Sequence, residues 1–171
     1  MELILIAAIA QNNVIGLNGE LPSWKIPEDI KRFKELTVRH PVIMGRTTYE
    51  SIPEKYRPLA DRRNIVLSRR DEYRPNGVEV VGSLEDAVNL VKCNPKLEFD
   101  ESSIYVIGGA QVYACAMPIA TKLEITQIHK SYIGDVYFPV IDKSIWKEVQ
   151  RVDRQSGVDR FSFVTYLRKE V

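Results

Sequence analysis

The sequence predicts one α/β domain, in which a mostly parallel central sheet of about eight strands is flanked by four helices and ends in an antiparallel hairpin. Short apolar runs alternate with helix-like segments over most of the chain. Several runs are apolar at every position, which is typical of parallel strands covered on both faces. The last two strand-like runs, Trp146–Asp153 and Phe161–Leu167, are joined by a short polar turn and indicate the hairpin.

Composition limits the possible functions. The chain has 171 residues, enough for one domain with a substantial core, and its 44% hydrophobic and 27% charged content is ordinary for a globular protein. The net charge of +1 produces no field that attracts nucleic acid or a membrane surface, so neither is an expected partner.

Apolar runs predict the parallel strands, in the order Leu3–Ala10, Val42–Met44, Ile65–Leu67, Val78–Val81, Ile104–Ile107 and Leu123–Ile128. The first run does not have the pattern of a signal peptide. It lacks a preceding basic region, follows Glu2, and is far shorter than the roughly 20 residues of a membrane span. We therefore expect a buried strand in a cytoplasmic protein.

Helices are predicted between these strands, over Pro27–Thr37, Thr47–Ile52, Leu84–Cys93 and Ala110–Met117. Pro27 suits a first helical turn, and Pro118 ends the fourth helix. Ser83 is a good N-cap, with Asp86 in the register of a capping box.

The cysteines and histidines form no recognisable motif. Cys93 and Cys115 suggest a reducing compartment, and Cys115 is predicted to be a core thiol within its helix. His40 and His129 are far from both cysteines in the sequence, so no metal site is predicted.

Asp29 is the strongest single candidate for function. At about 100° per residue, it shares a helix face with the apolar residues Ile26, Ile30, Phe33 and Leu36. A carboxylate on such a face is costly to desolvate unless a polar group meets it. Asp29 is therefore either a functional acid in a cleft or a structural acid satisfied by backbone donors.

Two strands run into glycine and then directly into a helix, at Gly45-Arg46 and at Gly108-Gly109. Glycine allows close approach of a ligand, and the free N–H groups of a helix start favour an anion. Each could be an ordinary turn, and neither has the spacing of the usual dinucleotide fingerprint. Together they suggest the two sides of one pyrophosphate site.

Arginines follow the third strand, at Arg69 and Arg70, where they could meet an additional phosphate such as the 2′-phosphate of NADP or form a solvated basic turn. Two long loops, Gln11–Lys25 and Pro53–Arg63, also follow strands or short helices, where function often resides in such sheets.

Taken in order, the motifs resemble dihydrofolate reductase of the bacterial chromosomal type. The matching blocks are Leu5–Ala10, Val14–Gly16, Leu21-Pro22, Trp24, Ile26–Ile30, Phe33, Pro41–Ile52, Arg57–Leu59, Arg62–Ser68, Ile107–Ala110 and Gly134–Pro139. The resemblance implies a single domain over residues 1–171, with an adenosine-binding lobe at roughly 40–110, that acts as a monomer.

The resemblance also implies a substrate site for dihydrofolate, and for antifolates such as methotrexate or trimethoprim. Asp29 would bind N3 and the 2-amino group of the pteridine, supported by Thr126, and Arg62 would bind the glutamate α-carboxylate as a bidentate pair. The implied substrate-binding residues are Ile6, Asp29, Ile30, Phe33, Ile52, Arg57, Leu59, Arg62, Ile107 and Thr126.

NADPH is the implied cofactor, with the glycine turns at its pyrophosphate and Arg46, Ser68 and Arg69 around its 2′-phosphate. The Gly108–Gly109 peptide bond is cis in this family. The implied cofactor-binding residues are Ala8, Val14, Ile15, Gly16, Gly45, Arg46, Thr47, Thr48, Leu67, Ser68, Arg69, Ile107, Gly108, Gly109, Ala110, Gln111, Val112 and Tyr113.

The implied reaction is hydride transfer from NADPH to C6 of dihydrofolate with protonation of N5. Asp29, Leu21 and Trp24 form the implied catalytic group, in which Asp29 tunes N5 and a water admitted past Leu21 delivers the proton. Leu21 replaces the methionine of well-known bacterial members, and Ser23 resembles a one-residue insertion in the same loop.

Two other functions fit part of the pattern. One is a reductase of a pyrimidine or riboflavin precursor on the same type of sheet, and the other is a non-catalytic nucleotide-binding protein. Asp29 beside Phe33, with Arg62 available for a carboxylate, favours folate.

Overall fold

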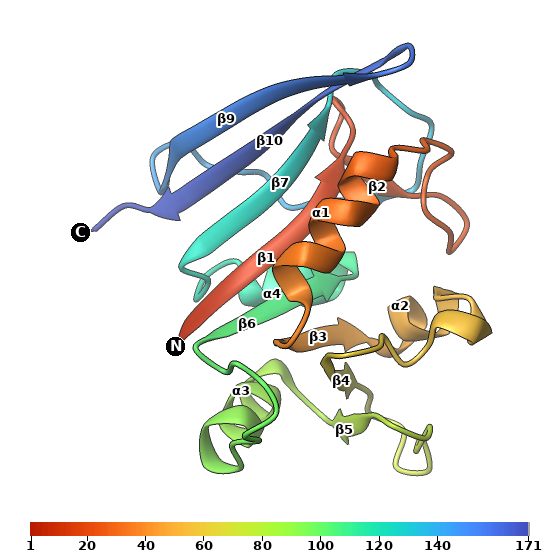
Figure 1. The fold of residues 1–171 in the computed structure, drawn as a ribbon, viewed down its shortest axis with the longest axis vertical. Helices are drawn as coiled ribbons and strands as arrows, with labels where there is room; N and C mark the ends of the chain where they lie inside the picture. The colour runs from red at the N-terminus through yellow and green to blue at the C-terminus, as the bar shows by residue number, and fades with distance from the viewer. Residues whose placement is uncertain (171) are drawn as a thin grey trace.

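The computed structural model describes residues 1–170 and contains the predicted α/β sheet (Figure 1). Its strands are β1 (Glu2–Ile9), β3 (Pro41–Gly45), β4 (Arg63–Leu67), β5 (Glu79–Val81), β6 (Ser103–Gly108), β7 (Lys122–Ile128), β9 (Trp146–Ser156) and β10 (Asp159–Arg168). They form one 8-stranded sheet in the order β5-β4-β3-β6-β1-β7-β10-β9. The pairings from β5 to β7 are parallel, whereas β10 is antiparallel to both β7 and β9. The predicted fold class is confirmed.

Helices lie close to their predicted bounds. They are α1 (Pro27–Thr37), α2 (Arg46–Ser51), α3 (Leu84–Cys93) and α4 (Ala110–Ala116), with a 3-10 turn η1 (Glu54–Tyr56). The predicted N-cap of α3 is confirmed, because Ser83 Oγ accepts a hydrogen bond from Asp86 N at 3.0 Å. Since Ser83 Oγ also donates to Asp86 Oδ2 at 2.7 Å, both groups at this helix start are paired.

Alternate residues of β1 enter two different cores, which explains why the strand is apolar throughout. Leu3 and Leu5 pack in the cluster that contains the buried sides of α3 and α4. Ile4 and Ile6 pack in the cluster that contains Tyr49 of α2 and the partly buried apolar residues of α1. The helices therefore cover both faces of the sheet, as the all-apolar runs predicted.

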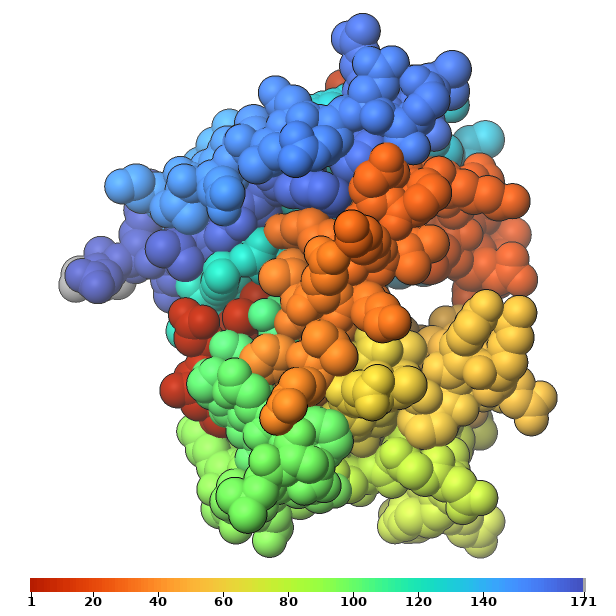
Figure 2. All heavy atoms as spheres, viewed as in Figure 1, coloured from red at the N-terminus to blue at the C-terminus, as the bar shows by residue number. Residues whose placement is uncertain are grey.

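A hollow opens on the face that carries α1. Figure 2 shows it between the orange surface of α1 and the loop preceding it and the gold surface formed by α2 and the residues that follow. None of the helices in residues 1–170 has the length and apolar content that a membrane span needs.

The prediction of a core thiol at Cys115 is wrong. Cys93 and Cys115 are both exposed, and the buried side of α4 is instead formed by Val112, Tyr113 and Ala116. Residues 112, 113 and 116 follow the helical period, so Cys115 falls on the outer side of a helix that the sequence shows as apolar all round.

A two-stranded ribbon was not predicted. It pairs β2 (Val14–Gly16) with β8 (Val136–Tyr137), and its strands are too short to show a periodic pattern. Asp135 N donates to Gly16 O at 3.1 Å, which fixes residues far apart in the sequence against each other.

Gly134 sets the spacing of this ribbon. A Cβ atom at this position would lie 2.2 Å from Val14 Cγ1 and 2.6 Å from Gly16 O. We expect Gly134→Ala to force the ribbon apart and to lower the free energy of unfolding by about 1–3 kcal/mol, the usual range for overpacking. Urea unfolding checks this, with Gly82→Ala as the control, because a Cβ there meets only Asp86 Oδ2 at 3.8 Å. Equal losses in the two variants would contradict the steric explanation.

Candidate active site

The sheet order places a switch point beside β1. From β1 the chain crosses to β3, β4 and β5, returns to β6 next to β1, and then continues to β7 on the other side. Crevices at the carboxyl ends of strands around such a point are the usual ligand sites of α/β sheets. The predicted glycine turns follow β3 and β6 at this edge.

Asp29 lies in the first turn of α1 and is paired with a side chain of the sheet. Its Oδ1 accepts a hydrogen bond of 2.5 Å from Oγ1 of Thr126, which is 1% exposed on β7. Burial raises the pKa of the Asp29 carboxyl, while the Thr126 hydrogen bond and the positive charge of Arg32 oppose the rise. The predicted pairing of these two residues is confirmed, and the partner is a hydroxyl group, not a backbone donor.

Several of the predicted apolar substrate-binding residues belong to one core cluster on the face of the sheet that carries α1. Phe33, Ile52, Leu59 and Ile107 all pack against the core cluster that contains Ile6. Low polarity around Asp29 is the physical cause of its raised pKa.

Ile30 departs from the predicted apolar face, because it is 69% exposed. The prediction used Ile26 as its reference, and Ile26 is the N-cap with extended backbone angles of φ −118 and ψ 94. The direction of the Ile26 side chain is therefore not set by the helical period, and Ile30 lies at the edge of the face of α1 that packs on the sheet.

Arg62 is held close to the same apolar wall. Its Nη1 donates to Thr37 Oγ1 at 3.2 Å, its Nε donates to Ala60 O at 2.8 Å, and its guanidinium lies 6.0 Å from the Phe33 ring centroid. A guanidinium in this place can bind a carboxylate at the end of a ligand that lies on Phe33.

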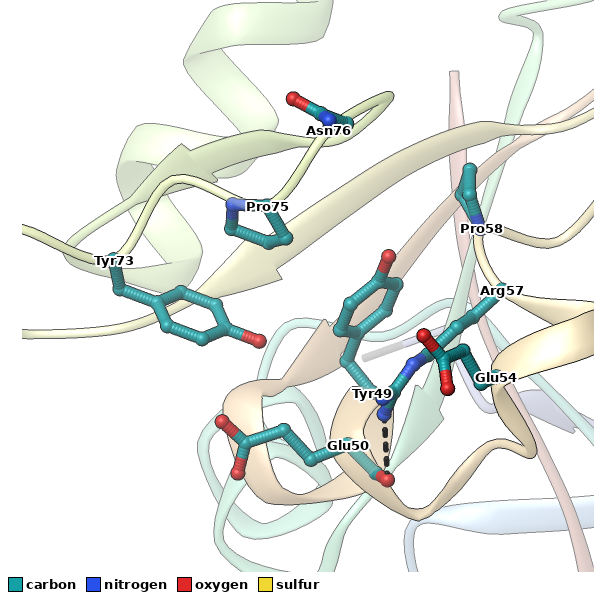
Figure 3. A pocket seen from close by; sticks show the side chains of 8 residues that line it. All are labelled: Tyr49, Glu50, Glu54, Arg57, Pro58, Tyr73, Pro75 and Asn76. Carbon is teal, nitrogen blue, oxygen red and sulfur yellow. Dashed lines mark hydrogen bonds between the residues drawn. The ribbon is translucent and has the colours of Figure 1, made fainter.

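Arg57 points to a different hollow. It donates to the backbone oxygen of Glu50 at 2.8 Å and lies 5.7 Å from the Tyr49 ring centroid (Figure 3). This second pocket is lined by Tyr49, Glu50, Glu54, Arg57, Pro58, Tyr73, Pro75 and Asn76. In this structure the Arg57 guanidinium is therefore engaged with α2.

The two glycine turns lie against each other. A Cβ atom on Gly45 would lie 3.3 Å from Val112 Cγ2 and 4.0 Å from Gly109 N, and one on Gly109 would lie 3.2 Å from Thr48 Oγ1. The Gly108–Gly109 peptide bond is cis, as predicted. Side chains at these positions would fill the space between the starts of α2 and α4, so the glycines keep backbone N–H groups accessible to an anion.

Comparison with known proteins agrees with this geometry. The family model described as dihydrofolate reductase matches residues 2–168. A dihydrofolate reductase of Neisseria meningitidis serogroup B is 45% identical over 170 residues, covering 98% of this chain and 99% of the relative. The dihydrofolate reductase HdrB of Haloferax volcanii is 43% identical over 171 residues, covering 99% of this chain and 85% of the relative.

A solved structure shows the same fold. The dihydrofolate reductase from Enterococcus faecalis, complexed with NADP(H) and RAB-propyl, aligns with a TM-score of 0.86 and 33% sequence identity, covering 99% of this chain and 97% of the other. The chain belongs to the dihydrofolate reductase family. It is accordingly an NADPH-dependent oxidoreductase of dihydrofolate.

In this dihydrofolate reductase, the loop from Gln11 to Lys25 is held at several points. Asn18 N contacts both carboxylate oxygens of Asp135 at 3.2 Å, and the Trp24 ring packs edge-on against Tyr132 with centroids 5.1 Å apart. Leu21 is 81% exposed between these anchors. The loop thus carries an exposed apolar residue on a fixed base.

Sequence reasoning did not identify every residue around the reductase site. Asp135 and Tyr132 were missed as anchors of the Gln11–Lys25 loop, since nothing local in the sequence pairs them with Asn18 and Trp24. Arg32 and Glu124, which lie beside Asp29 and Thr126, form an ion pair that was also missed. An acid within a strand whose residues 123–126 are all buried, as at Glu124, was the available signal.

Proposed function

We propose that this dihydrofolate reductase binds the pteridine ring of 7,8-dihydrofolate through Asp29 and protonates N5 while C6 receives a hydride. The observation that carries the proposal is the partly enclosed Asp29 carboxylate, bonded to Thr126 and flanked by apolar side chains at the switch point of the sheet. A carboxylate there can accept two hydrogen bonds from an amino-pyrimidine edge, which matches N3 and the 2-amino group.

The residues around the glycine turns fit NADPH. Gly45, Arg46, Thr47 and Thr48 at the start of α2, with Gly108 to Val112 at the start of α4, would hold its pyrophosphate, and Tyr113 would lie near the nicotinamide. The support for this fit is the space between the starts of α2 and α4, which a Cβ atom on Gly109 would fill. Arg46, Ser68 and Arg69, next to Leu67 at the end of β4, would meet the 2′-phosphate, and Ala8, Ile15 and Gly16, backed by the buried Val14, would meet the nicotinamide. Bound NADPH supplies the hydride.

The protein's own residues supply position and the proton. Asp29 orients the ring and, as a negative charge in an apolar pocket, makes N5 more basic. A water that passes Leu21 delivers the proton, and Trp24 supports the loop that admits it. Phe33, Ile52 and Leu59, with Ile30 at the edge, enclose the ring and exclude other solvent. Proton delivery of this kind contributes about 10²–10⁴ in rate.

Arg62 distinguishes folate from tailless substrates. We expect Arg62→Leu to raise KM for dihydrofolate at least about tenfold through loss of a charge-assisted pair, with little change for a dihydropterin that lacks the glutamate. Arg74→Leu is the matched control, because Arg74 is exposed and bonds only to the neighbouring Tyr73 O. The corresponding Arg57→Leu variant tests whether Arg57 leaves Glu50 to flank the bound glutamate.

The direct test of function follows the NADPH absorbance band on addition of dihydrofolate. Loss of absorbance that methotrexate or trimethoprim blocks supports the proposal. Turnover of a pyrimidine or riboflavin precursor in its place would support the related reductase, and absence of turnover would support a non-catalytic nucleotide-binding protein.

The chain is further proposed to act as a cytoplasmic monomer of one domain over residues 1–171, with residues 40–110 as its adenosine-binding lobe. The continuous sheet through both parts supports this organisation. Sedimentation at enzyme-assay concentration tests the monomer.

A further inference from the structure

Asp29 belongs to a pair of parallel contacts between α1 and the sheet. Asp29 and Arg32 are one turn apart on α1, and Thr126 and Glu124 are two residues apart on the same face of β7. Thr126 bonds to Asp29, and Arg32 Nη2 lies 2.5 Å from Glu124 Oε2. The second contact therefore fixes the rotation of α1 that the first contact needs.

Both carboxylate oxygens of Glu124 have polar partners, and these partners lie on three different elements. Thr165 Oγ1 on β10 donates to Glu124 Oε2 at 2.9 Å, and Lys122 Nζ lies 2.8 Å from Glu124 Oε1. The Arg32 guanidinium also lies 4.7 Å from the Phe163 ring centroid. The side chains of Arg32 and Glu124 are only 17% and 6% exposed, so this arrangement is rigid and largely shielded from solvent.

The cluster has a net positive charge. Arg32 of α1 and Lys122 of β7 contribute two cations against the single carboxylate of Glu124 on β7. A buried ion pair is seldom worth more stability than apolar residues of similar size, so stability alone does not account for it. Its charge does affect Asp29, because Arg32 opposes the rise in the pKa of that carboxyl.

We propose that Arg32 and Glu124 are positioning residues for the reduction, which orient Asp29 toward Thr126 and hold it in the ionised form that binds the pteridine. This inference rests on the proposed role of Asp29. It assigns opposite electrostatic effects to the two partners, since Arg32 stabilises the Asp29 anion and Glu124 weakens that effect.

Few other titratable groups face Asp29. From α4, the Tyr113 hydroxyl donates to Ile6 O at 2.7 Å, and burial raises the pKa of Tyr113 so far that it stays protonated. From β6, Tyr105 is also buried, and burial raises its pKa. Phe163 and Thr165 of β10 carry no charge. Within residues 1–170, Arg32 is therefore the charged side chain that acts on the pKa of Asp29, and Glu124 and Lys122 are the charges joined to it in the cluster.

The test is a titration of the Asp29 carboxyl carbon by NMR in the ligand-free protein labelled with ¹³C-aspartate, with the signal assigned by its loss in Asp29→Asn. We expect Arg32→Gln to raise the pKa of Asp29 by about half a unit to one unit and Glu124→Gln to lower it. Arg32→Lys keeps the charge and should stay near wild type. Thr165→Val, which removes a hydrogen bond to Glu124 but no charge, is the matched control.

Opposite shifts in the two glutamine variants support the proposal, because a purely structural role predicts changes in one direction. Shifts of the same sign, or none, overturn it. If Arg32→Gln does not fold, the more exposed Lys122→Gln must give a smaller rise, and its absence overturns the proposal equally.

The pH profile of kcat/KM for dihydrofolate separates this inference from the proposed function. A one-unit shift in the pKa should change the rate tenfold on the limb that Asp29 controls. NMR shifts of the expected signs with an unmoved rate profile would support the electrostatic coupling and reject the role of Asp29 in the reaction.

Discussion

Asp29→Asn is expected to reduce turnover of dihydrofolate at neutral pH by at least about 10²-fold while leaving NADPH affinity within a few-fold of wild type. The amide keeps the size of the side chain and can still accept from Thr126, but it removes the negative charge that binds the pteridine and raises the basicity of N5. Stopped-flow hydride transfer measures the loss, and a fluorescence titration measures NADPH binding.

The pH dependence of this variant is equally informative. The rate loss should shrink as the pH falls, because solution protons increasingly replace the contribution of the site to N5. A variant that turned over within a few-fold of wild type at neutral pH would reject the role of Asp29, and a parallel loss of NADPH binding would indicate a damaged fold.

Asp29→Asn should also stabilise the ligand-free protein at neutral pH. The folded-state pKa of Asp29 is raised above the unfolded value of 3.8, so the stability linked to its protonated form is complete below that value and lost as the pH rises through the folded pKa. The asparagine variant has no such loss. Urea unfolding should show it more stable than wild type at neutral pH and equal to wild type well below pH 3.8. Equal stability of the two proteins at every pH would mean that burial does not disfavour the charged form of the Asp29 carboxyl.

The parts of this site that the sequence predicted are those encoded by local patterns. The bounds of α1, the place of Asp29 on it and the glycine turns at Gly45 and Gly108 follow from helical period, proline in the first turn and glycine placement within short segments. They were predictable because each depends on neighbours along the chain.

Other parts depend on contacts between distant segments. The Arg32–Glu124 pair joins residues 92 positions apart, and nothing local in the sequence pairs the two. Val14–Gly16 pairs with Val136–Tyr137 across a similar separation, and neither strand is long enough for a pattern. The exposed Cys115 was mispredicted for a different reason, because the composition of a helix alone does not say which of its sides faces the sheet.

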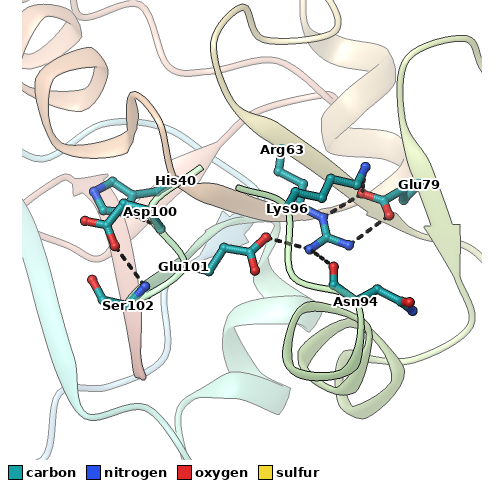
Figure 4. A network of polar contacts seen from close by, with 8 residues as sticks. All are labelled: His40, Arg63, Glu79, Asn94, Lys96, Asp100, Glu101 and Ser102. Carbon is teal, nitrogen blue, oxygen red and sulfur yellow. Dashed lines mark hydrogen bonds and ion pairs between the residues drawn. The ribbon is translucent and has the colours of Figure 1, made fainter. Parts of the chain in front are cut away.

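At the amino end of β4, Arg63 joins several elements of the region from residue 40 to 110 (Figure 4). Its guanidinium donates to both carboxylate oxygens of Glu79 at 2.8 and 2.9 Å, to Glu101 at 2.6 Å, and to Asn94 O at 3.0 Å. Lys96 adds a second cation to Glu79 at 3.0 Å. The Arg63 side chain is only 1% exposed, so β4, β5, the end of α3 and the turn before β6 meet at one buried charge.

Arg63→Met is expected to lower the free energy of unfolding by about 3–5 kcal/mol, because it leaves two carboxylates of the network without their main partner. Arg151→Met is the matched control. Arg151 also forms a two-point contact with a carboxylate, Glu148, at 2.7 and 2.9 Å, but both side chains are more than a third exposed, and such surface pairs contribute roughly 0–1 kcal/mol. Urea unfolding of the two variants compares the same substitution in buried and exposed settings, and equal losses would contradict the importance of burial.

The contribution of Arg63 to stability should depend on pH. Arg63 holds the pKa of Glu79 below its unfolded value of 4.5, so the stabilisation from this pair is present above that pH and is lost as the pH falls through the folded pKa. The difference in free energy of unfolding between wild type and Arg63→Met should therefore become smaller below about pH 4.5. A loss caused only by the missing side-chain volume would persist at acid pH.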